Sequence, residues 1–386
     1  MGDIMYQNRR EHLAQMLAVA GLLGSGTRSL AQNGEVITAR VPEFTPSTLV
    51  RIRESAGIPA ISAAYSSAGA QPTIISDGLR SADATRPVTD SDLWHIGSNT
   101  KSMTSTLVAR AVEQGKVGWD TTVGEILGDA IGTMKEPYRA VNFRHLCSHH
   151  AGLTGETPVD GYATDEPNLM VERRRLSAWA LEQDPIAAPG EKWLYSNTGY
   201  VTAAVMLETV YGEPWEALMQ AHIFAPLQLR SAGFGPPGTV GQLDQPLGHG
   251  VAEDPKGEGA PLAPARLGDA DNPADLPGVY GPAGLAHMSV TDLIAYLNVH
   301  CYGLESFLTP QNWQVLHTPP FTADYAMGWL VRPDGSLWHN GSNRKWYAET
   351  AFHRESNRVA CVTTNSGDLE SATPAVQAIL SAAMTA

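Results

Sequence analysis

The chain has 386 residues, of which 43% are hydrophobic and 17% are charged, with a formal net charge of −14 and a pI near 5.3. A chain of this length buries a large core and exceeds what one ordinary domain needs, so two closely packed lobes are expected. The acidic balance argues against a nucleic-acid partner, because phosphate backbones select clustered Lys and Arg. A small neutral or mildly polar substrate fits better, and no cofactor is expected.

The N-terminal residues 1–31 have the pattern of an export signal. Asn8, Arg9 and Arg10 precede an apolar run over residues 13–24, and Ser29-Leu30-Ala31 offers a small-x-small cleavage site. The paired arginines resemble a twin-arginine signal, which predicts export to a bacterial periplasm. An amphipathic N-terminal helix is the alternative. The run is too short to span a bilayer and no other segment is long enough, so no stable membrane insertion is expected.

The three cysteines of the chain are widely spread and odd in number: Cys147, Cys301 and Cys361. They show no CxxC pairing of the kind that indicates zinc or a redox dithiol. We interpret them as buried thiols, with one disulfide as the alternative.

The first predicted elements are a short helix over residues 47–52 and two strands over 60–65 and 73–79, which alternate and are rich in β-branched residues. From Ser98 the apolar residues recur with helical period as far as Gly115, a plausible C′ glycine. Helices and loops are expected from about residue 119 to 229.

The second half of the chain returns to strands. The residues from 233 to 281 are crowded with Gly, Pro and Asp, which predicts either a pocket-lining excursion or a mobile cover. A helix is predicted over residues 289–298. Strands follow over residues 325–331, 336–339, 346–353 and 359–365, and a last helix begins at about residue 369. The turn at 332–335 holds a Pro and a Gly suited to a hairpin.

This order predicts an α/β sheet domain assembled from residues 32–115 and 281–386, with a helical domain inserted over 116–280 that carries the pocket-lining loop.

Ser98-Asn99-Thr100-Lys101 is the first candidate for chemistry. A serine hydroxyl is a weak nucleophile at neutral pH, so it needs a base beside it and donors where the oxyanion develops. Residues i and i+3 share a helix face, which brings Lys101 beside Ser98, and burial would favour the neutral amine that a base requires. An exposed helical turn is the alternative for this short motif.

Two further motifs complete the candidate site. Tyr195-Ser196-Asn197 supplies a phenol able to relay a proton and an amide able to orient the lysine and the substrate carbonyl. In His339-Asn340-Gly341-Ser342, Gly341 lets the substrate approach the backbone, and the Ser342 amide would pair with that of Ser98 as an oxyanion hole. The alternatives are a packed loop aromatic and an ordinary strand end.

SxxK, then YxN, then HxG, in this order, resembles the β-lactamase and DD-peptidase superfamily, and within it the class C-like branch of esterases and D-peptidases. The segments 93–97, 145–153, 281–285 and 327–329 are also similar to connecting segments of that superfamily. The resemblance implies an antiparallel sheet flanked by helices with an inserted helical domain, a catalytic set of Ser98, Lys101 and Tyr195, and an acyl-enzyme intermediate.

One departure from the superfamily bears on the substrate. Its penicillin-recognising members usually have a lysine where this chain has His339, and that lysine meets the substrate carboxylate. A histidine is mostly neutral at pH 7, which argues against a carboxylate-bearing substrate. Arg344 lies just beyond and either restores that recognition or points to solvent.

Two clusters invite other interpretations. His145, Cys147, His149 and His150 have the side chains of a zinc site, but their segment matches one in which the superfamily uses a histidine to support a turn, so no metal is expected. Four aromatic side chains flank the second and third motifs and line either an acyl pocket or the core: Trp193, Trp338, Trp346 and Tyr347.

The sequence therefore predicts a serine hydrolase that cleaves an ester, lactone or amide through an acyl-enzyme on Ser98. The alternatives are a penicillin-binding D-amino-acid peptidase or β-lactamase, and a catalytically silent binding domain. The acyl group, the leaving group and the oligomeric state are not indicated.

Overall fold

The computed structural model describes residues 42–67, 70–153, 168–251 and 262–386. The helices are α2 (Pro46–Ser55), α3 (Thr100–Glu113), α4 (Val123–Leu127), α5 (Glu136–Arg139), α6 (Phe143–Cys147), α7 (Leu169–Glu182), α8 (Asn197–Tyr211), α9 (Trp215–Met219), α10 (Gly281–Gly284), α11 (Val290–Tyr302), α12 (Pro310–His317) and α13 (Leu369–Thr385). The strands are β1 (Ala60–Ser67), β2 (Thr73–Gly78), β3 (Leu93–His95), β4 (Gly233–Phe234), β5 (Gly248–Val251), β6 (Leu262–Ala265), β7 (Ala286–Ser289), β8 (Leu330–Val331), β9 (Leu337–Ser342), β10 (Tyr347–His353) and β11 (Arg358–Thr364). Three short helical turns complete the set: η1 (Gly97–Asn99), η3 (Gln220–Phe224) and η4 (Gly278–Tyr280).

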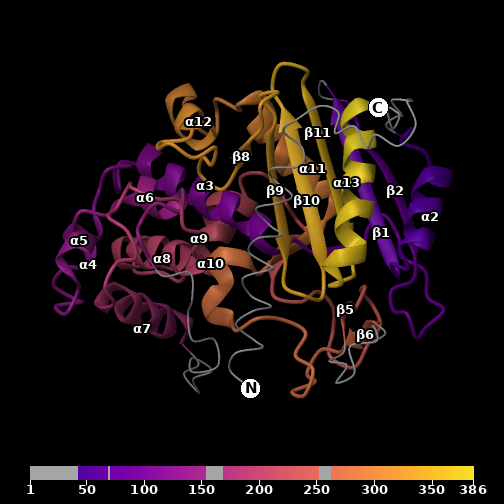
Figure 1. Cartoon of the computed structure of the whole chain (residues 1–386), viewed down its shortest axis with the longest axis horizontal. Helices are drawn as coiled ribbons and strands as arrows, with labels where there is room; N and C mark the ends of the chain where they lie inside the picture. The colour runs from indigo at the N-terminus through magenta and orange to yellow at the C-terminus, as the bar shows by residue number, and fades with distance from the viewer. Residues whose placement is uncertain (1–41, 68–69, 154–167, 252–261) are drawn as a thin grey trace, which may run out of the picture.

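The main sheet joins the two ends of the chain. Its strand order is β2-β1-β11-β10-β9-β8, and every neighbouring pair is antiparallel. β1 thus pairs with β11, which follows almost 300 residues later, and β2 forms the edge beside β1. Figure 1 shows this sheet on one side of the molecule and the helices α4 to α9 on the other. The predicted antiparallel sheet flanked by helices is confirmed, with strands from both chain ends.

Alternating side chains give the sheet two buried faces. In β11, Ala360 and Val362 join a core cluster with α13, whereas Val359 and Cys361 join the larger cluster that contains α11. Successive side chains of a strand point to opposite faces, so a strand that is apolar at every position needs a helix on each side. α13 and α11 therefore cover opposite faces of the sheet.

Most elements form where the sequence predicts them. The helix α2 begins after Thr45, whose hydroxyl accepts the Thr48 amide at 3.2 Å, and α3 ends before Gly115, which has a φ of +67°. The three cysteines are free and buried, as predicted. The hairpin turn between β8 and β9 uses Gly335 at a φ of +83°.

The strand predicted over residues 325–331 is wrong for most of its length. Only Leu330 and Val331 form β8, and Tyr325 makes a single bridge to Leu330. The chain turns at Gly328, which has a φ of +82° and lies so close to α3 that an added Cβ would be 2.6 Å from the Cα of Ser102. This close approach of two backbones, rather than pairing in a sheet, sets the local conformation.

The residues between 233 and 281 are not a plain loop. β4 pairs with β7, which also pairs with β3, and β5 pairs with β6. The His249 amide donates to the Asn365 carbonyl at 3.0 Å, which ties β5 to the end of β11. The division into a sheet domain and an inserted helical domain stays a prediction.

The predicted export signal over residues 1–31 lies outside the described residues and stays a prediction. Within the ranges that are described, no helix is both long enough and apolar enough to cross a bilayer.

Candidate active site

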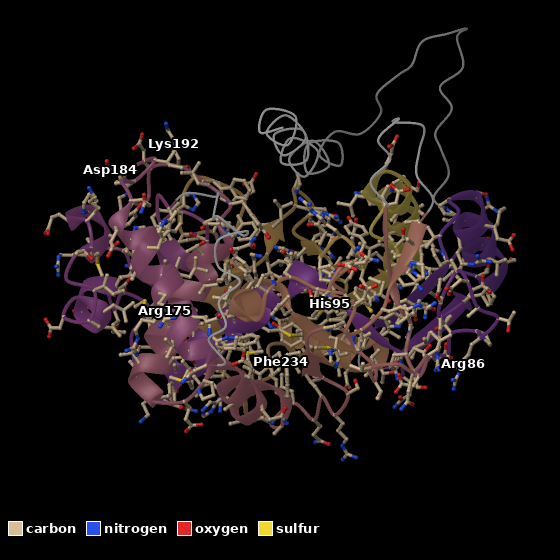
Figure 2. The ribbon with its side chains drawn as sticks, turned by 90° about the horizontal axis from the view of Figure 1, so that it is seen from below. Arg86, His95, Arg175, Asp184, Lys192 and Phe234 are labelled. Carbon is tan, nitrogen blue, oxygen red and sulfur yellow. The ribbon has the colours of Figure 1, made fainter. Side chains whose placement is uncertain are left out.

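Ser98 lies in η1, the turn that joins β3 to α3, rather than in the first turn of the helix that the sequence predicts. Gly97 has a φ of +53°, and a Cβ on it would lie 2.4 Å from the Ser342 nitrogen, so only glycine fits. Ser98 is half-buried, whereas Lys101 in the first turn of α3 is fully buried. Figure 2 shows His95, three residues before Ser98, near the middle of the molecule. The nucleophile candidate thus sits where the sheet meets the helices.

The Lys101 amine has three oxygen neighbours. Its Nζ lies 2.9 Å from the Ser98 hydroxyl, 2.8 Å from Asn197 Oδ1 and 2.7 Å from the Ala283 carbonyl. Burial lowers the pKa of Lys101 well below its usual 10.5. The Asn197 and Ala283 oxygens can only accept, so in the neutral amine they take both N–H groups. The lone pair is then left for the Ser98 proton.

Tyr195 completes the contact with the serine. Its hydroxyl donates to Ser98 Oγ at 2.8 Å, and burial raises its pKa. Tyr195 stands two residues before α8, whose N-cap is Ser196, so the start of that helix fixes both Tyr195 and Asn197. The phenol, which is 97 residues from Ser98 along the chain, therefore converges with the neighbouring hydroxyl and amine.

His149 supports Tyr195 from behind. The two rings lie 4.3 Å apart at 34°, and His149 Nδ1 accepts the Ser196 amide at 3.0 Å. Burial lowers the pKa of His149 well below its usual value, and the nearby Lys101 lowers it further. The sequence indicated a turn-supporting histidine here but not its contact with the phenol.

The third motif, in β9, brings His339 to the site with both ring nitrogens engaged. Nδ1 donates to the Asn340 carbonyl at 2.5 Å, so Nε2 accepts the Tyr325 hydroxyl at 2.8 Å. Burial, with Lys101 nearby, lowers the pKa of His339 to about 3. The ring is therefore neutral and has no free N–H for a substrate anion. Tyr325 was not found from the sequence, because nothing in its local pattern distinguishes it from a strand residue.

The backbone of β9 touches the backbone of η1. A Cβ on Gly341 would lie 2.2 Å from the Ile96 carbonyl and 2.3 Å from the Ser98 nitrogen. The Ser342 side chain is committed to the following turn, since it donates to the Trp346 carbonyl at 2.8 Å and accepts the Arg344 amide at 2.9 Å. The arrangement thus places the Ser98 and Ser342 backbones side by side, as an oxyanion hole requires.

Apart from His149, the histidines that suggested a metal site bond to their own segment of the chain. Among the residues that the structure covers, no three side chains of the metal-binding types come together, and His145 and His150 bond locally to Asn142 and Ser148. Burial lowers the pKa of both histidines.

The aromatic residues divide between core and site. Trp338 and Tyr347 belong to the core cluster with α13, and Trp346 is fully buried in the larger one. Core packing is therefore the correct interpretation for these three. Only Trp193 is half-buried beside the site, with its ring 6.2 Å from that of Tyr195.

An antiparallel sheet with helices beside it, and a serine in the turn before a helix in contact with a buried lysine and a phenol, define a class of serine hydrolases. The chain belongs to the β-lactamase family, whose model matches residues 38–384.

Curated relatives of different activities match the chain. It is 27% identical to penicillin-binding protein 4 of Amycolatopsis lactamdurans over 59% of this chain and 55% of that protein. It is 23% identical to the putative penicillin-binding protein PbpX of Bacillus subtilis over 70% of this chain and 62% of that protein. Esterase EstB of Burkholderia gladioli is 30% identical over 41% of this chain and 42% of the esterase. The matches thus span less than two thirds of each relative.

Solved structures share the fold. A penicillin-binding protein homologue of Pyrococcus abyssi, described as octameric, superposes with a TM-score of 0.67 at 24% identity over 83% of this chain and 72% of that one. A D-amino acid amidase of Ochrobactrum anthropi superposes with a TM-score of 0.69 at 20% identity over 88% and 98%. At these identities the similarity concerns the fold.

Proposed function

We propose that this serine hydrolase cleaves an ester, lactone or amide without a carboxylate next to the scissile bond, through an acyl-enzyme on Ser98, with esters as the preferred substrates. The observation that carries the proposal is the contact of Ser98 Oγ with both the Lys101 amine at 2.9 Å and the Tyr195 hydroxyl at 2.8 Å. These distances lie within proton-transfer range.

The two partners of the serine have different tasks. Neutral Lys101 takes the Ser98 proton as Oγ attacks the carbonyl carbon, and the backbone amides of Ser98 and Ser342 receive the oxyanion. Tyr195, kept as a neutral phenol by its raised pKa, gives its proton to the leaving oxygen or nitrogen as the bond to the acyl carbon breaks. The proton on Lys101 then passes to the Tyr195 oxygen.

Water completes the cycle. It attacks the acyl carbon of the Ser98 ester while neutral Lys101 takes its proton, and the departing Ser98 oxygen takes the proton of Tyr195. The proton on Lys101 then returns to the Tyr195 oxygen. The products are the free acid and the free enzyme, so the protons balance over the two steps.

His339 supports an uncharged acyl group. A substrate carboxylate needs a cation or a free N–H at the third motif, and His339 is neutral with both nitrogens engaged. This disfavours the second candidate function, a penicillin-binding D-amino-acid peptidase or β-lactamase. Arg344 is exposed in the turn after β9 and forms a separate candidate for carboxylate binding.

A silent binding domain is the third candidate. The fully buried Lys101 disfavours it, because burial of an amine costs free energy that a domain without chemistry has no reason to spend.

The test is a panel of p-nitrophenyl esters, a lactone, a D-amino-acid amide and benzylpenicillin against the wild type and Ser98→Ala. We expect turnover of the short esters by the wild type only, labelling of Ser98 by a fluorophosphonate, and no stable penicillin adduct by mass spectrometry. Equal ester turnover by Ser98→Ala would refute the acyl-enzyme. A penicilloyl adduct on Ser98 would instead support the second candidate.

A further inference from the structure

His95 is a fully buried histidine that no step of the proposed reaction uses. It ends β3, and its Nδ1 accepts the Gly97 amide at 3.2 Å. Its ring stacks on Trp346, with centroids 5.6 Å apart. Because Nδ1 accepts, it carries a lone pair, and the ring proton is on Nε2.

That Nε2 atom faces a carboxylate from a distant segment. It lies 3.0 Å from Asp275 Oδ2, and the Asp275 side chain is only 8% exposed. The contact is a close approach of the two groups rather than an aligned hydrogen bond, and among the described residues neither atom has a hydrogen-bonding partner. Asp275 therefore fixes which nitrogen of His95 carries the proton.

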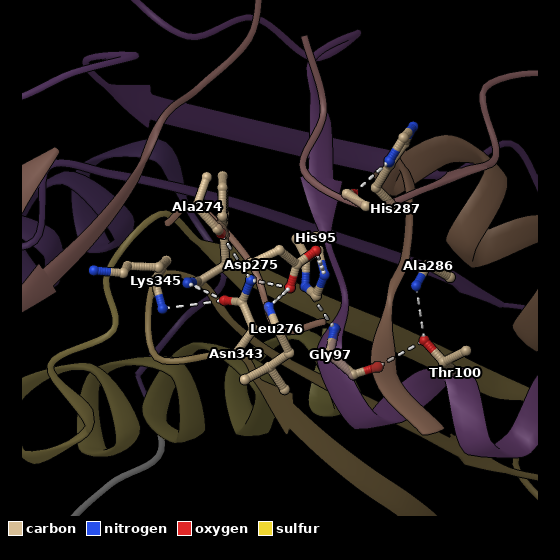
Figure 3. A network of polar contacts seen from close by, with 12 residues as sticks. His95, Gly97, Thr100, Ala274, Asp275, Leu276, Ala286, His287, Asn343 and Lys345 are labelled. Carbon is tan, nitrogen blue, oxygen red and sulfur yellow. Dashed lines mark hydrogen bonds and ion pairs between the residues drawn. The ribbon is translucent and has the colours of Figure 1, made fainter. Parts of the chain in front are cut away.

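The second oxygen of Asp275 holds the other strand. Oδ1 accepts the Asn343 side-chain amide and the Leu276 backbone amide, each at 2.8 Å. Asn343 follows Ser342 directly, and its own Oδ1 accepts the Trp346 amide at 3.0 Å, which shapes the turn between β9 and β10. Figure 3 shows His95 and Asn343 meeting at Asp275 from opposite sides.

One carboxylate thus joins the two backbone segments that carry the oxyanion donors. Through His95 it reaches Gly97, the neighbour of Ser98, and through Asn343 it reaches the neighbour of Ser342. The contact between these segments is close, since a Cβ on Gly97 would lie 2.4 Å from the Ser342 nitrogen. Donors to an oxyanion lose their effect when they shift by a fraction of an ångström.

We propose that Asp275 is a positioning residue that keeps the Ser98 and Ser342 amides aligned, with His95 and Asn343 as its two arms. The proposal rests on the proposed function of Ser98. Asp275 belongs to the range 233–281, for which the sequence predicted only a pocket lining or a cover. The proposal assigns this residue a role in the reaction.

Asp275→Asn tests the proposal with an almost unchanged shape. The new amide oxygen must accept from Asn343 and Leu276, so its NH₂ faces His95 Nε2. If the ring keeps its proton there, two donors oppose each other. If the proton moves to Nδ1, it opposes the Gly97 amide instead. Either outcome disturbs the backbone next to Ser98 while Lys101 and Tyr195 stay in place.

The experiment measures p-nitrophenyl ester hydrolysis by the wild type, Asp275→Asn, His95→Asn and the double variant, with Ser98→Ala as the blank. Asp271→Asn is the matched control, because it is an exposed carboxylate in the same segment. We expect Asp275→Asn to lower kcat by about 10- to 100-fold and to weaken binding of phenylboronic acid, a tetrahedral mimic, by a similar factor. KM and the shape of the pH profile should change little, whereas the Tm should fall, because two buried donors then oppose each other.

The double variant gives the sharpest outcome. With the ring gone in His95→Asn, the added Asp275→Asn change should cost less than about twofold, because the pair is already broken. Unchanged kcat in Asp275→Asn, a loss of kcat without weaker boronate binding, or additive losses in the double variant would each overturn the proposal. Should Asp275→Asn fail to fold, His95→Asn alone supports the same comparison with the boronate. Turnover by Ser98→Ala would contradict the proposed function instead.

Discussion

Ser98 has two differently built sides. On one side, Lys101 and Tyr195 contact its hydroxyl with side-chain atoms at 2.9 and 2.8 Å. On the other side, the backbone of η1 at Gly97 contacts the backbone of β9 at Gly341, and neither glycine has room for a Cβ. The first side depends on protonation states that burial controls. The second depends on the relative position of β9 and η1, and Asp275 connects these two segments through Asn343 and His95.

The difference teaches that a substitution can damage this site by two separate routes. Loss of a side chain on the first side removes a proton acceptor or donor and changes the pH profile. A shift on the second side leaves the pH profile alone and weakens binding of the tetrahedral state. Measuring both quantities for each variant separates the two routes.

Lys101→Arg should have the largest effect. An arginine stays protonated at any pH at which the protein is folded, so it cannot accept the Ser98 proton. We expect kcat/KM for a p-nitrophenyl ester to fall by about 10³- to 10⁴-fold. The control is Lys135→Arg, at a half-exposed ion pair with Asp184, which should leave the rate unchanged. A loss below tenfold would mean that Lys101 is not the base.

Gly341→Ala should have the next largest effect, through the backbone alone. Its Cβ would meet the Ile96 carbonyl and the Ser98 nitrogen, so the two segments must separate. We expect a loss of about 10²- to 10³-fold in kcat with an unchanged pH profile. Gly132→Ala, where an added Cβ meets nothing within 4 Å, is the matched control. Full activity in Gly341→Ala would show that the close backbone contact is not required.

The smallest expected effect is a pH-dependent difference in stability between Lys101→Met and the wild type, whereas the activity of this variant should be lost as in Lys101→Arg. Because burial lowers the pKa of Lys101 well below 10.5, the unfolded chain binds more protons than the folded one between the folded pKa and 10.5. The stability of the wild type therefore rises with pH across this window. Lys101→Met lacks this contribution. The Tm of the wild type should therefore rise relative to that of Lys101→Met as the pH increases toward 10.5. Parallel Tm curves would contradict a lowered lysine pKa.

The neighbouring histidines do not obscure this comparison at neutral and alkaline pH. Burial is the main cause that lowers the pKa values of His149 and His339, and the charge of Lys101 is a smaller one, so both rings are neutral in this range in either protein. Other titrating groups are shared and cancel in the difference.

Much of the fold and the proton-handling side was accessible from the sequence. Ser98 and Lys101 are three residues apart where the turn η1 leads into α3, and local backbone geometry brings them together. The strands predicted over residues 346–353 and 359–365 correspond to β10 and β11. The 325–331 segment was wrong because the backbone of Gly328 packs on α3, a long-range contact that leaves no trace in local alternation.

The sequence by itself determined which chemical groups the site holds and in what order they occur: the hydroxyl, the amine, the phenol, and a histidine in place of a cation. Only the tertiary structure decided their states. It buried Lys101, engaged both nitrogens of His339 and brought Asp275 between His95 and Asn343. The physical reason is that desolvation and hydrogen-bond partners arise from segments up to some 250 residues apart in this chain, and no local pattern encodes which of them will meet.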